Sequence, residues 1–205
     1  MSKVKAKEGK EEINLPDDVK EKFEQLKAKL DKLKKALLDK FSEYIVGIAL
    51  LPPANIEREK MLAKESGREL SQDEIKKLNE HINVLVLVDD SDSKKMSKED
   101  LANKLNTVID KVANDVDKNL KIQTLILSEL RELCFDGKYE IADQIAMSAP
   151  VYDPHDLIAA LRIATVHKNM TIKKFEKYII SYIAAGSLFR GEKSNDIDVY
   201  VVVDD

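Results

Sequence analysis

Apolar and polar residues follow two different periods along the chain, and these periods predict a mixture of helices and strands. Pro16-Asp17-Asp18 is a helix-start signal, and the apolar residues after it are spaced three and four apart, which predicts one long helix. These residues are Phe23, Leu26, Leu30, Leu33, Leu37 and Tyr44. The spacing fits either a coiled-coil partner site or a helix laid across the protein's own sheet. A pattern of only about three heptads favours the second.

Two apolar runs predict buried strands. Ile45–Leu51 stops at two prolines, and Val84–Val88 is closed by two aspartates. Ile122–Leu127 alternates loosely between apolar and polar residues, which predicts a third strand. Helices are predicted after the capping-box pattern Ser71–Glu74, over Ser97 to about Asn119, over Tyr139–Met147, and as two separate helices over Asp156–His167 and Thr171–Tyr178. The polar residues 1–15 are expected to form a flexible charged tail, and Pro150–Pro154 to end the unit.

Two segments of the sequence resemble each other in the same order. Phe41-Ser-Glu-Tyr44-Ile45-Val46 recurs as Phe175-Glu-Lys-Tyr178-Ile179-Ile180, and Val84–Asp90 recurs as Val199–Asp205. Chance similarity between apolar strands is the alternative explanation, but the shared aromatic pattern and the doubled aspartate favour a tandem duplication. We expect residues 16–155 to be the first copy and residues 156–205 the start of a second, incomplete copy.

Composition narrows the classes of function. With 43% hydrophobic and 35% charged residues among 205, the chain can bury a core. The single cysteine, Cys134, excludes a disulfide framework, a thiolate zinc site and a CxxC redox centre, and favours a cytoplasmic location. A net charge of -4 and the absence of tryptophan argue against bulk coating or stacking of nucleic acid. No apolar run approaches the ~18 residues of a membrane span.

The loop between the last two apolar segments contains the candidate phosphate-binding and metal-binding residues. Gly186 and Ser187 would offer backbone N–H groups and a hydroxyl to a phosphate. Asp196 and Asp198 stand two residues apart at a strand start, so both carboxylates would lie on one face and Ile197 on the other. Two carboxylates on one face suit Mg²⁺, which prefers oxygen ligands.

The string Gly-Ser, Arg-Gly, Asp-x-Asp over residues 186–199 resembles the signature of the DNA-polymerase-β-type nucleotidyltransferase superfamily, and is most similar to its small archaeal and bacterial members. The resemblance implies an α+β fold, a short mixed sheet flanked by helices, which we expect on one face. It implies metal-dependent transfer of a nucleotide from a nucleoside triphosphate to a hydroxyl of RNA, protein or a small molecule. Asp196 and Asp198 would be the catalytic ligands of a two-metal Mg²⁺ site, with Mn²⁺ as a substitute. Gly186 and Ser187 would bind the triphosphate. Arg190 could contact phosphate or be a solvated loop cation.

The sequence departs from the family pattern in two places. Pro52-Pro53 falls where the second copy has Gly186-Ser187, and His81-Ile82-Asn83 falls where it has Asp196-Ile197-Asp198, so the first copy is expected to be degenerate. The family's third carboxylate lies on a later strand, which this chain does not reach. We therefore expect a truncated form with an incomplete active centre.

The alternative function is a non-catalytic binding or scaffolding module for RNA or a protein partner. It would use the Lys-rich helix from Val19 to Lys40. We expect no membrane association. A homo-oligomer formed through exposed strand edges or through the N-terminal helix is a further expectation.

Overall fold

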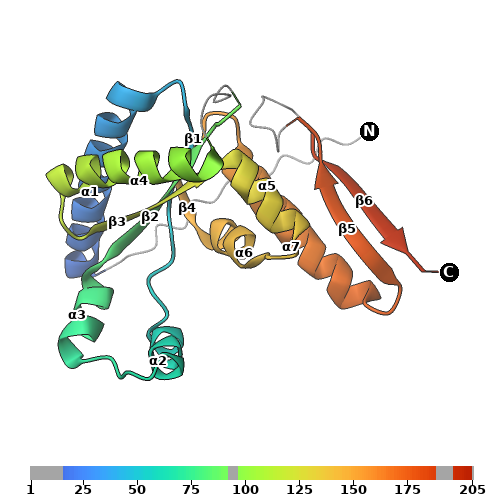
Figure 1. Ribbon diagram of the computed structural model, residues 1–205, viewed down its shortest axis with the longest axis horizontal. Coiled ribbons are helices and arrows are strands. Elements are labelled where there is room, and N and C mark those ends of the chain that lie inside the picture. Colours follow the sequence, from blue (N-terminus) through green and yellow to red (C-terminus); the bar gives the residue numbers. More distant parts are fainter. Residues whose placement is uncertain (1–15, 92–96, 188–195, 205) are drawn as a thin grey trace.

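The computed structural model describes residues 16–91, 97–187 and 196–204, which form a four-stranded sheet with helices and a two-stranded hairpin (Figure 1). The predicted tail over residues 1–15 and Arg190 lie outside the described residues. The helices are α1 (Asp17–Phe41), α2 (Ile56–Glu65), α3 (Gln72–Glu80), α4 (Lys98–Val116), α5 (Leu127–Phe135), α6 (Glu140–Met147) and α7 (Leu157–Phe175). The strands are β1 (Ile45–Leu50), β2 (Ile82–Val88), β3 (Leu120–Ile126), β4 (Ala149–Tyr152), β5 (Ile179–Ala185) and β6 (Asp198–Val203).

The four-stranded sheet has the order β3-β2-β1-β4. β1 pairs antiparallel with β2 and with β4, whereas β2 and β3 are parallel, so the sheet is mixed. The three predicted strands are confirmed as β1, β2 and β3. The predicted class, α+β with a mixed sheet flanked by helices, is therefore correct.

Helices cover both faces of this sheet, which corrects the expectation of one covered face. On one face, Leu33 of α1 and Ile109 of α4 are buried in the cluster that contains Val84 and Val86. On the other, Ile145 of α6 and Ile158 of α7 are buried with Leu85, Leu87 and Ala49. The physical reason is visible in β2, because every residue of Val84–Val88 is apolar and buried. A strand that hides both of its faces needs a layer on each.

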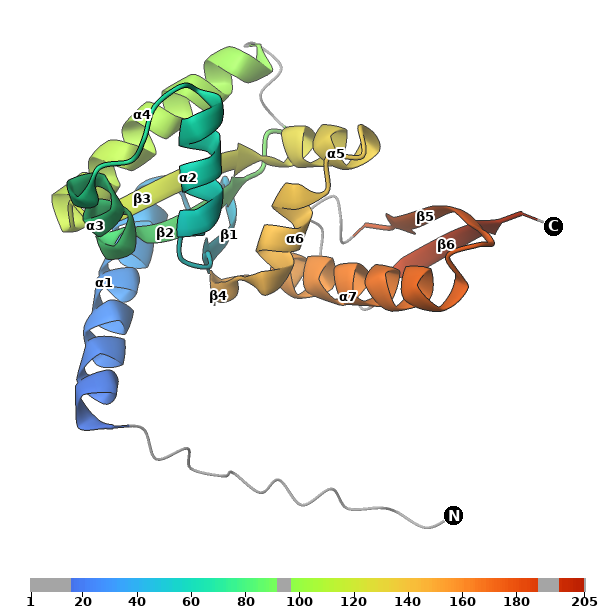
Figure 2. The same cartoon turned by 90° about the horizontal axis from the view of Figure 1, so that it is seen from below.

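Helix α1 packs on the sheet through its C-terminal half. Leu30, Leu33 and Leu37 are buried there, which confirms the helix-on-sheet interpretation of the heptad-like pattern for this half. The first turns of α1 extend past the sheet (Figure 2), and Phe23 is 58% exposed. Lys29 of α1 forms an ion pair with Asp117, the residue after α4, at 2.7 Å.

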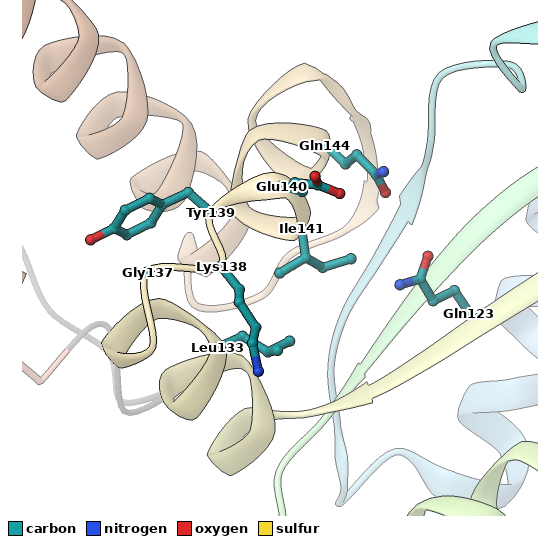
Figure 3. Close-up of a pocket in the computed structure, with 8 residues that line it drawn as sticks. All are labelled: Gln123, Leu133, Gly137, Lys138, Tyr139, Glu140, Ile141 and Gln144. Atoms are coloured by element: carbon teal, nitrogen blue, oxygen red, sulfur yellow. The ribbon is translucent and has the colours of Figure 1, made fainter. Parts of the chain in front are cut away.

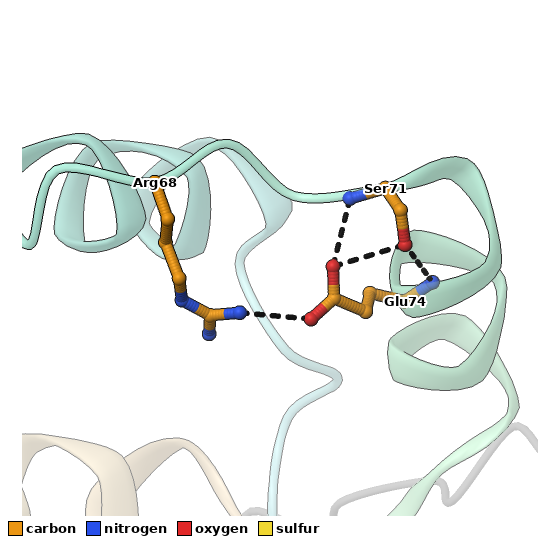
Figure 4. A network of polar contacts seen from close by, with 3 residues as sticks. All are labelled: Arg68, Ser71 and Glu74. Atoms are coloured by element: carbon orange, nitrogen blue, oxygen red, sulfur yellow. Dashed lines mark hydrogen bonds and ion pairs between the residues drawn. The ribbon is translucent and has the colours of Figure 1, made fainter.

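Capping residues set several helix boundaries. The capping box predicted at Ser71 is present, because the hydroxyl of Ser71 accepts from the N–H of Glu74 and the carboxylate of Glu74 accepts from the N–H of Ser71 (Figure 4). Arg68 donates to the same carboxylate at 2.8 Å. Asp153 caps α7 from outside the helix, since its carboxylate accepts from the N–H groups of Ile158 and Ala159.

Three features differ from the sequence prediction. The two helices predicted between Asp156 and Tyr178 are one continuous helix, α7, because no Gly or Pro interrupts the segment. Ala149–Tyr152, expected to end the unit, pairs with β1 as an edge strand, the position in a sheet where Pro150 is tolerated. The helices α2 and α5 were not predicted.

The β5–β6 hairpin pairs in the same register as β1 and β2. Ile45 pairs with Val88, and Ile179 pairs with Val203, and a bulge follows each pair. After the bulge the ladders continue in step, through Gly47–Leu87 and Ser181–Val202 to Leu50–Val84 and Ala184–Val199. Equivalent backbone bonds close both ladders, because Asp89 N donates to Tyr44 O and Asp204 N donates to Tyr178 O, each at 2.8 Å.

Candidate functional site

The predicted site residues Gly186 and Asp198 meet at one end of the β5–β6 hairpin. Ala185, the last residue of β5, pairs with Asp198, the first residue of β6. Gly186 follows with φ of +113°, a conformation that favours glycine. A Cβ atom at Gly186 would lie 3.2 Å from Oδ2 of Asp198, so glycine leaves room for this carboxylate beside the backbone. Ser187 is half-buried next to it.

Asp196 and Asp198 flank a residue of opposite exposure. Both aspartates are exposed, whereas Ile197 between them is half-buried. Asp198 is the first residue of β6, and Asp196 and Ile197 precede the strand. The side that carries Asp198 continues along β6 through Tyr200 and Val202, both exposed.

The donor set fits part of a metal site. Two exposed carboxylates two residues apart, with a glycine beside Oδ2 of Asp198, are the oxygen donors that a hard divalent cation prefers. Within residues 16–91, 97–187 and 196–204, no group of three or more His, Cys, Asp or Glu side chains could hold a metal ion.

The equivalent end of the β1–β2 ladder has different chemistry. Leu51 N donates to Asn83 O at 2.8 Å. The pair of residues at the matching position of the hairpin is Ala185 and Asp198. Pro52-Pro53 follow β1, and His81 precedes β2. Burial, and then the charge of Lys121, lowers the pKa of His81 from its usual 6.5. This end of the sheet lacks the paired carboxylates and has a neutral imidazole beside a lysine instead.

An open hollow lies elsewhere, between β3 and the α5–α6 connection (Figure 3). Its lining residues are Gln123, Leu133, Gly137, Lys138, Tyr139, Glu140, Ile141 and Gln144. Gln123 of β3 faces Gln144 of α6 across it, and Tyr139 points toward α7, where Lys168 Nζ lies 4.6 Å from the ring centroid. The hollow contains none of the predicted site residues. Sequence reasoning did not find it, because α5, which contributes Leu133, was not predicted.

Comparisons with protein-family models, with curated proteins and with solved structures find no match to this chain. Among the described residues, no helix has both the length and the apolar content needed to cross a membrane.

Proposed function

We propose that the end of the β5–β6 hairpin is the metal- and phosphate-binding part of a nucleotidyltransferase, which moves a nucleotide from a nucleoside triphosphate to a hydroxyl acceptor. The observation that supports this proposal best is the contact between Gly186 and Asp198, where the Gly-Ser turn and the first aspartate of the strand lie side by side. Backbone N–H groups near a positive-φ glycine suit phosphate, and the adjacent carboxylates suit a cation bridging to it.

In this proposal Asp196 and Asp198 hold Mg²⁺, Gly186 and Ser187 contact the triphosphate, and Arg190 adds a charge to phosphate. The bound metal would neutralise negative charge on the phosphates and the attacking oxygen. The chain's own part is to orient the nucleotide at the strand end, where both aspartates are exposed.

We further propose that the chain arose by duplication, with a degenerate first copy. The shared bulge position and the residue-by-residue register of the two ladders support this. If so, the first copy exchanged its phosphate turn for Pro52-Pro53 and its carboxylates for His81 and Asn83.

The test separates metal binding from transfer. Mn²⁺ added to the protein should broaden the NMR signals of residues near Gly186, and Mg²⁺ should compete. Asp198→Asn should abolish the broadening, whereas Asp204→Asn, the same change at the other end of β6, should leave it unchanged. Incorporation of labelled nucleotide into RNA or protein acceptors should depend on Mg²⁺ and on Asp196 and Asp198. Transfer that persists in Asp196→Asn/Asp198→Asn would refute the proposal.

A second candidate is a binding module for RNA, and one observation favours it. Lys32, Lys35 and Lys40 are exposed on the half of α1 that packs on the sheet. Binding through such lysines would release counterions, so the affinity for an RNA oligonucleotide should fall steeply as salt increases. An affinity that the triple Lys→Gln variant leaves unchanged would exclude this role for α1.

A further inference from the structure

The hollow between β3 and the α5–α6 connection lies where one face of the sheet changes from apolar to polar (Figure 3). In the parallel pairing of β2 and β3, Leu85 lies beside Gln123, and Leu87 lies beside Leu125. The three leucines are buried, whereas Gln123 is exposed and lines a hollow of about 670 Å³. A hollow of this volume has the size of a small-molecule site. We call it the glutamine hollow, after Gln123 and Gln144, which both line it.

The two glutamines bring hydrogen-bonding groups to the hollow that have no protein partner. Gln123 of β3 and Gln144 of α6 face each other across it (Figure 3), and neither side chain forms a hydrogen bond with another described residue. Each amide has one acceptor oxygen and two donor N–H groups. An opposed pair of amides is therefore suited to the edge of a planar ring on which donors and acceptors stand side by side, as on a nucleobase.

The hollow also has an apolar wall. Leu133 of α5 and Ile141 of α6 line it, and both are half-buried against the core cluster that contains Leu125 and Ile145. A flat ring placed in the hollow would bury apolar surface against these two side chains while its edge reaches the amides. Apolar walls with a few convergent polar groups are typical of small-molecule sites.

The charges around the hollow favour a ligand with one anionic group. Lys138 lines the hollow, and its only ion pair among the described residues is an exposed one with Asp136, at 3.3 Å, which competes weakly with a ligand. The one carboxylate among the lining residues, that of Glu140, is paired with Arg58 of α2 at 2.6 Å. Helix α6 begins directly after Lys138 and Tyr139 without a side-chain cap, so its first N–H groups add to the attraction for an anion.

We propose that the glutamine hollow binds a nucleoside monophosphate, with the base between Gln123 and Gln144 and the phosphate at Lys138. A nucleobase combines a planar apolar body with a donor–acceptor edge, and the phosphate supplies the anion. The further charges of a triphosphate would have no cation among the lining residues, so we expect the monophosphate to bind at least as tightly.

This site is separate from the proposed site of nucleotide transfer. The glutamine hollow belongs to the four-stranded sheet and its helices, whereas Gly186 and Asp198 lie at the end of the hairpin. The hollow has no unpaired carboxylate among its lining residues, so binding there should need no metal ion. The inference therefore does not depend on the proposed enzymatic activity.

The experiment is an NMR titration of the whole chain with AMP, CMP, GMP and UMP in EDTA, which removes the metal ion that the hairpin site would need. At least one monophosphate should shift the side-chain amide signals of Gln123 and Gln144. The matching nucleoside should bind about tenfold more weakly, because it lacks the charge-assisted contact with Lys138. Inorganic phosphate should leave the two amide signals unchanged.

Two substitutions separate recognition of the base from recognition of the phosphate. Gln144→Leu should weaken the binding of monophosphate and nucleoside alike, by about tenfold. Lys138→Gln should lower the affinity of the monophosphate to that of the nucleoside and leave the nucleoside unaffected. Gln25→Leu on α1 and Lys104→Gln on α4 are the matched controls, because both side chains are exposed and neither lines the hollow, and they should change neither affinity.

Three results would overturn the proposal. If none of the four monophosphates binds at millimolar concentration, the hollow is not a nucleotide site. If Gln144→Leu leaves the affinity of the monophosphate unchanged, the amides do not recognise the base. If the monophosphate shifts the backbone signals of Gly186 and Ser187 and not the amide signals of the two glutamines, the nucleotide binds at the hairpin. This last result would leave the proposed function standing while it removes the glutamine hollow.

Discussion

The carboxylate of Asp198 lies against the backbone of Gly186, so closely that a Cβ atom on Gly186 would be 3.2 Å from Oδ2. A methyl group at this position would push the carboxylate away from its place at the strand start. We expect Gly186→Ala to lower the affinity for Mn²⁺ about tenfold, the usual result of displacing a metal ligand's support. Titration of Mn²⁺ followed by relaxation of water protons measures this.

Gly67 provides the control for this prediction. It also has positive φ, +73°, but a Cβ atom there would meet nothing within 4 Å. Gly67→Ala therefore introduces the same kind of backbone strain, about 1 kcal/mol, without touching a carboxylate. Equal losses of Mn²⁺ affinity in the two variants would show that the contact with Asp198 is irrelevant.

The carboxylate of Glu74 should titrate far below its ordinary range. Hydrogen bonds from the backbone N–H and then the hydroxyl of Ser71, with Arg68 third, lower the pKa of Glu74 from 4.5 to about 2 (Figure 4). Because the pKa is depressed in the folded chain, its contribution to stability is present above pH 4.5 and is lost as the pH falls toward about 2. The carboxyl carbon shift, followed against pH, should show a midpoint near 2 that rises in Ser71→Ala. A wild-type midpoint near 4.5 would contradict the capping box.

His81 should be neutral at pH 7. Burial and the nearby Lys121 lower the pKa of His81 below 6.5, so the folded chain binds this proton less readily than the unfolded chain. Protonation of His81 is therefore less favourable in the folded chain, so the free energy of unfolding should be unaffected above pH 6.5 and should fall as the pH drops through the lowered pKa. Lys121→Gln should raise the pKa of His81 in an NMR titration. Lys118→Gln removes an exposed charge from the turn before β3 and should not change it.

The regular elements could be predicted where a single local pattern defines them. The apolar run Val84–Val88 is short, rich in valine and closed by two aspartates, which favours a buried strand, and Ser71–Glu74 encodes its own cap, so both were predicted correctly. Helix α7 was wrongly divided in two, although no Gly or Pro interrupts it. Its cap was also missed, because Asp153 accepts from N–H groups of residues five and six positions later and leaves no pattern at the helix itself.

The hairpin shows what local patterns leave open. The repeat of Phe41-Ser-Glu-Tyr44 as Phe175-Glu-Lys-Tyr178 predicted similar strands, and the registers match, but the sequence could not indicate that the β1–β2 ladder is buried on both faces while the hairpin keeps exposed side chains such as Tyr200. Burial depends on elements far away in the chain, such as Ile145 and Ile158 against Leu85. The contact between Gly186 and Asp198 likewise needs the pairing of Ala185 with Asp198, although the residue types were predictable.

Gly47 follows the bulge of β1 and lies close to the core, because a Cβ atom there would be 3.0 Å from Cδ1 of Ile158 and 3.3 Å from Cδ1 of Leu87. Gly47→Val should therefore overpack this face of the sheet and lower the free energy of unfolding in urea by about 1–3 kcal/mol. Ile158→Ala makes room for the added methyl groups. The double variant should therefore lose less free energy of unfolding than the sum of the losses in the two single variants. The equivalent bulge position of β5, Ser181, is the control, because it is not packed in the core and Ser181→Val should change stability little. Additive costs for Gly47 and Ile158 would show that the close contact does not govern packing at this bulge.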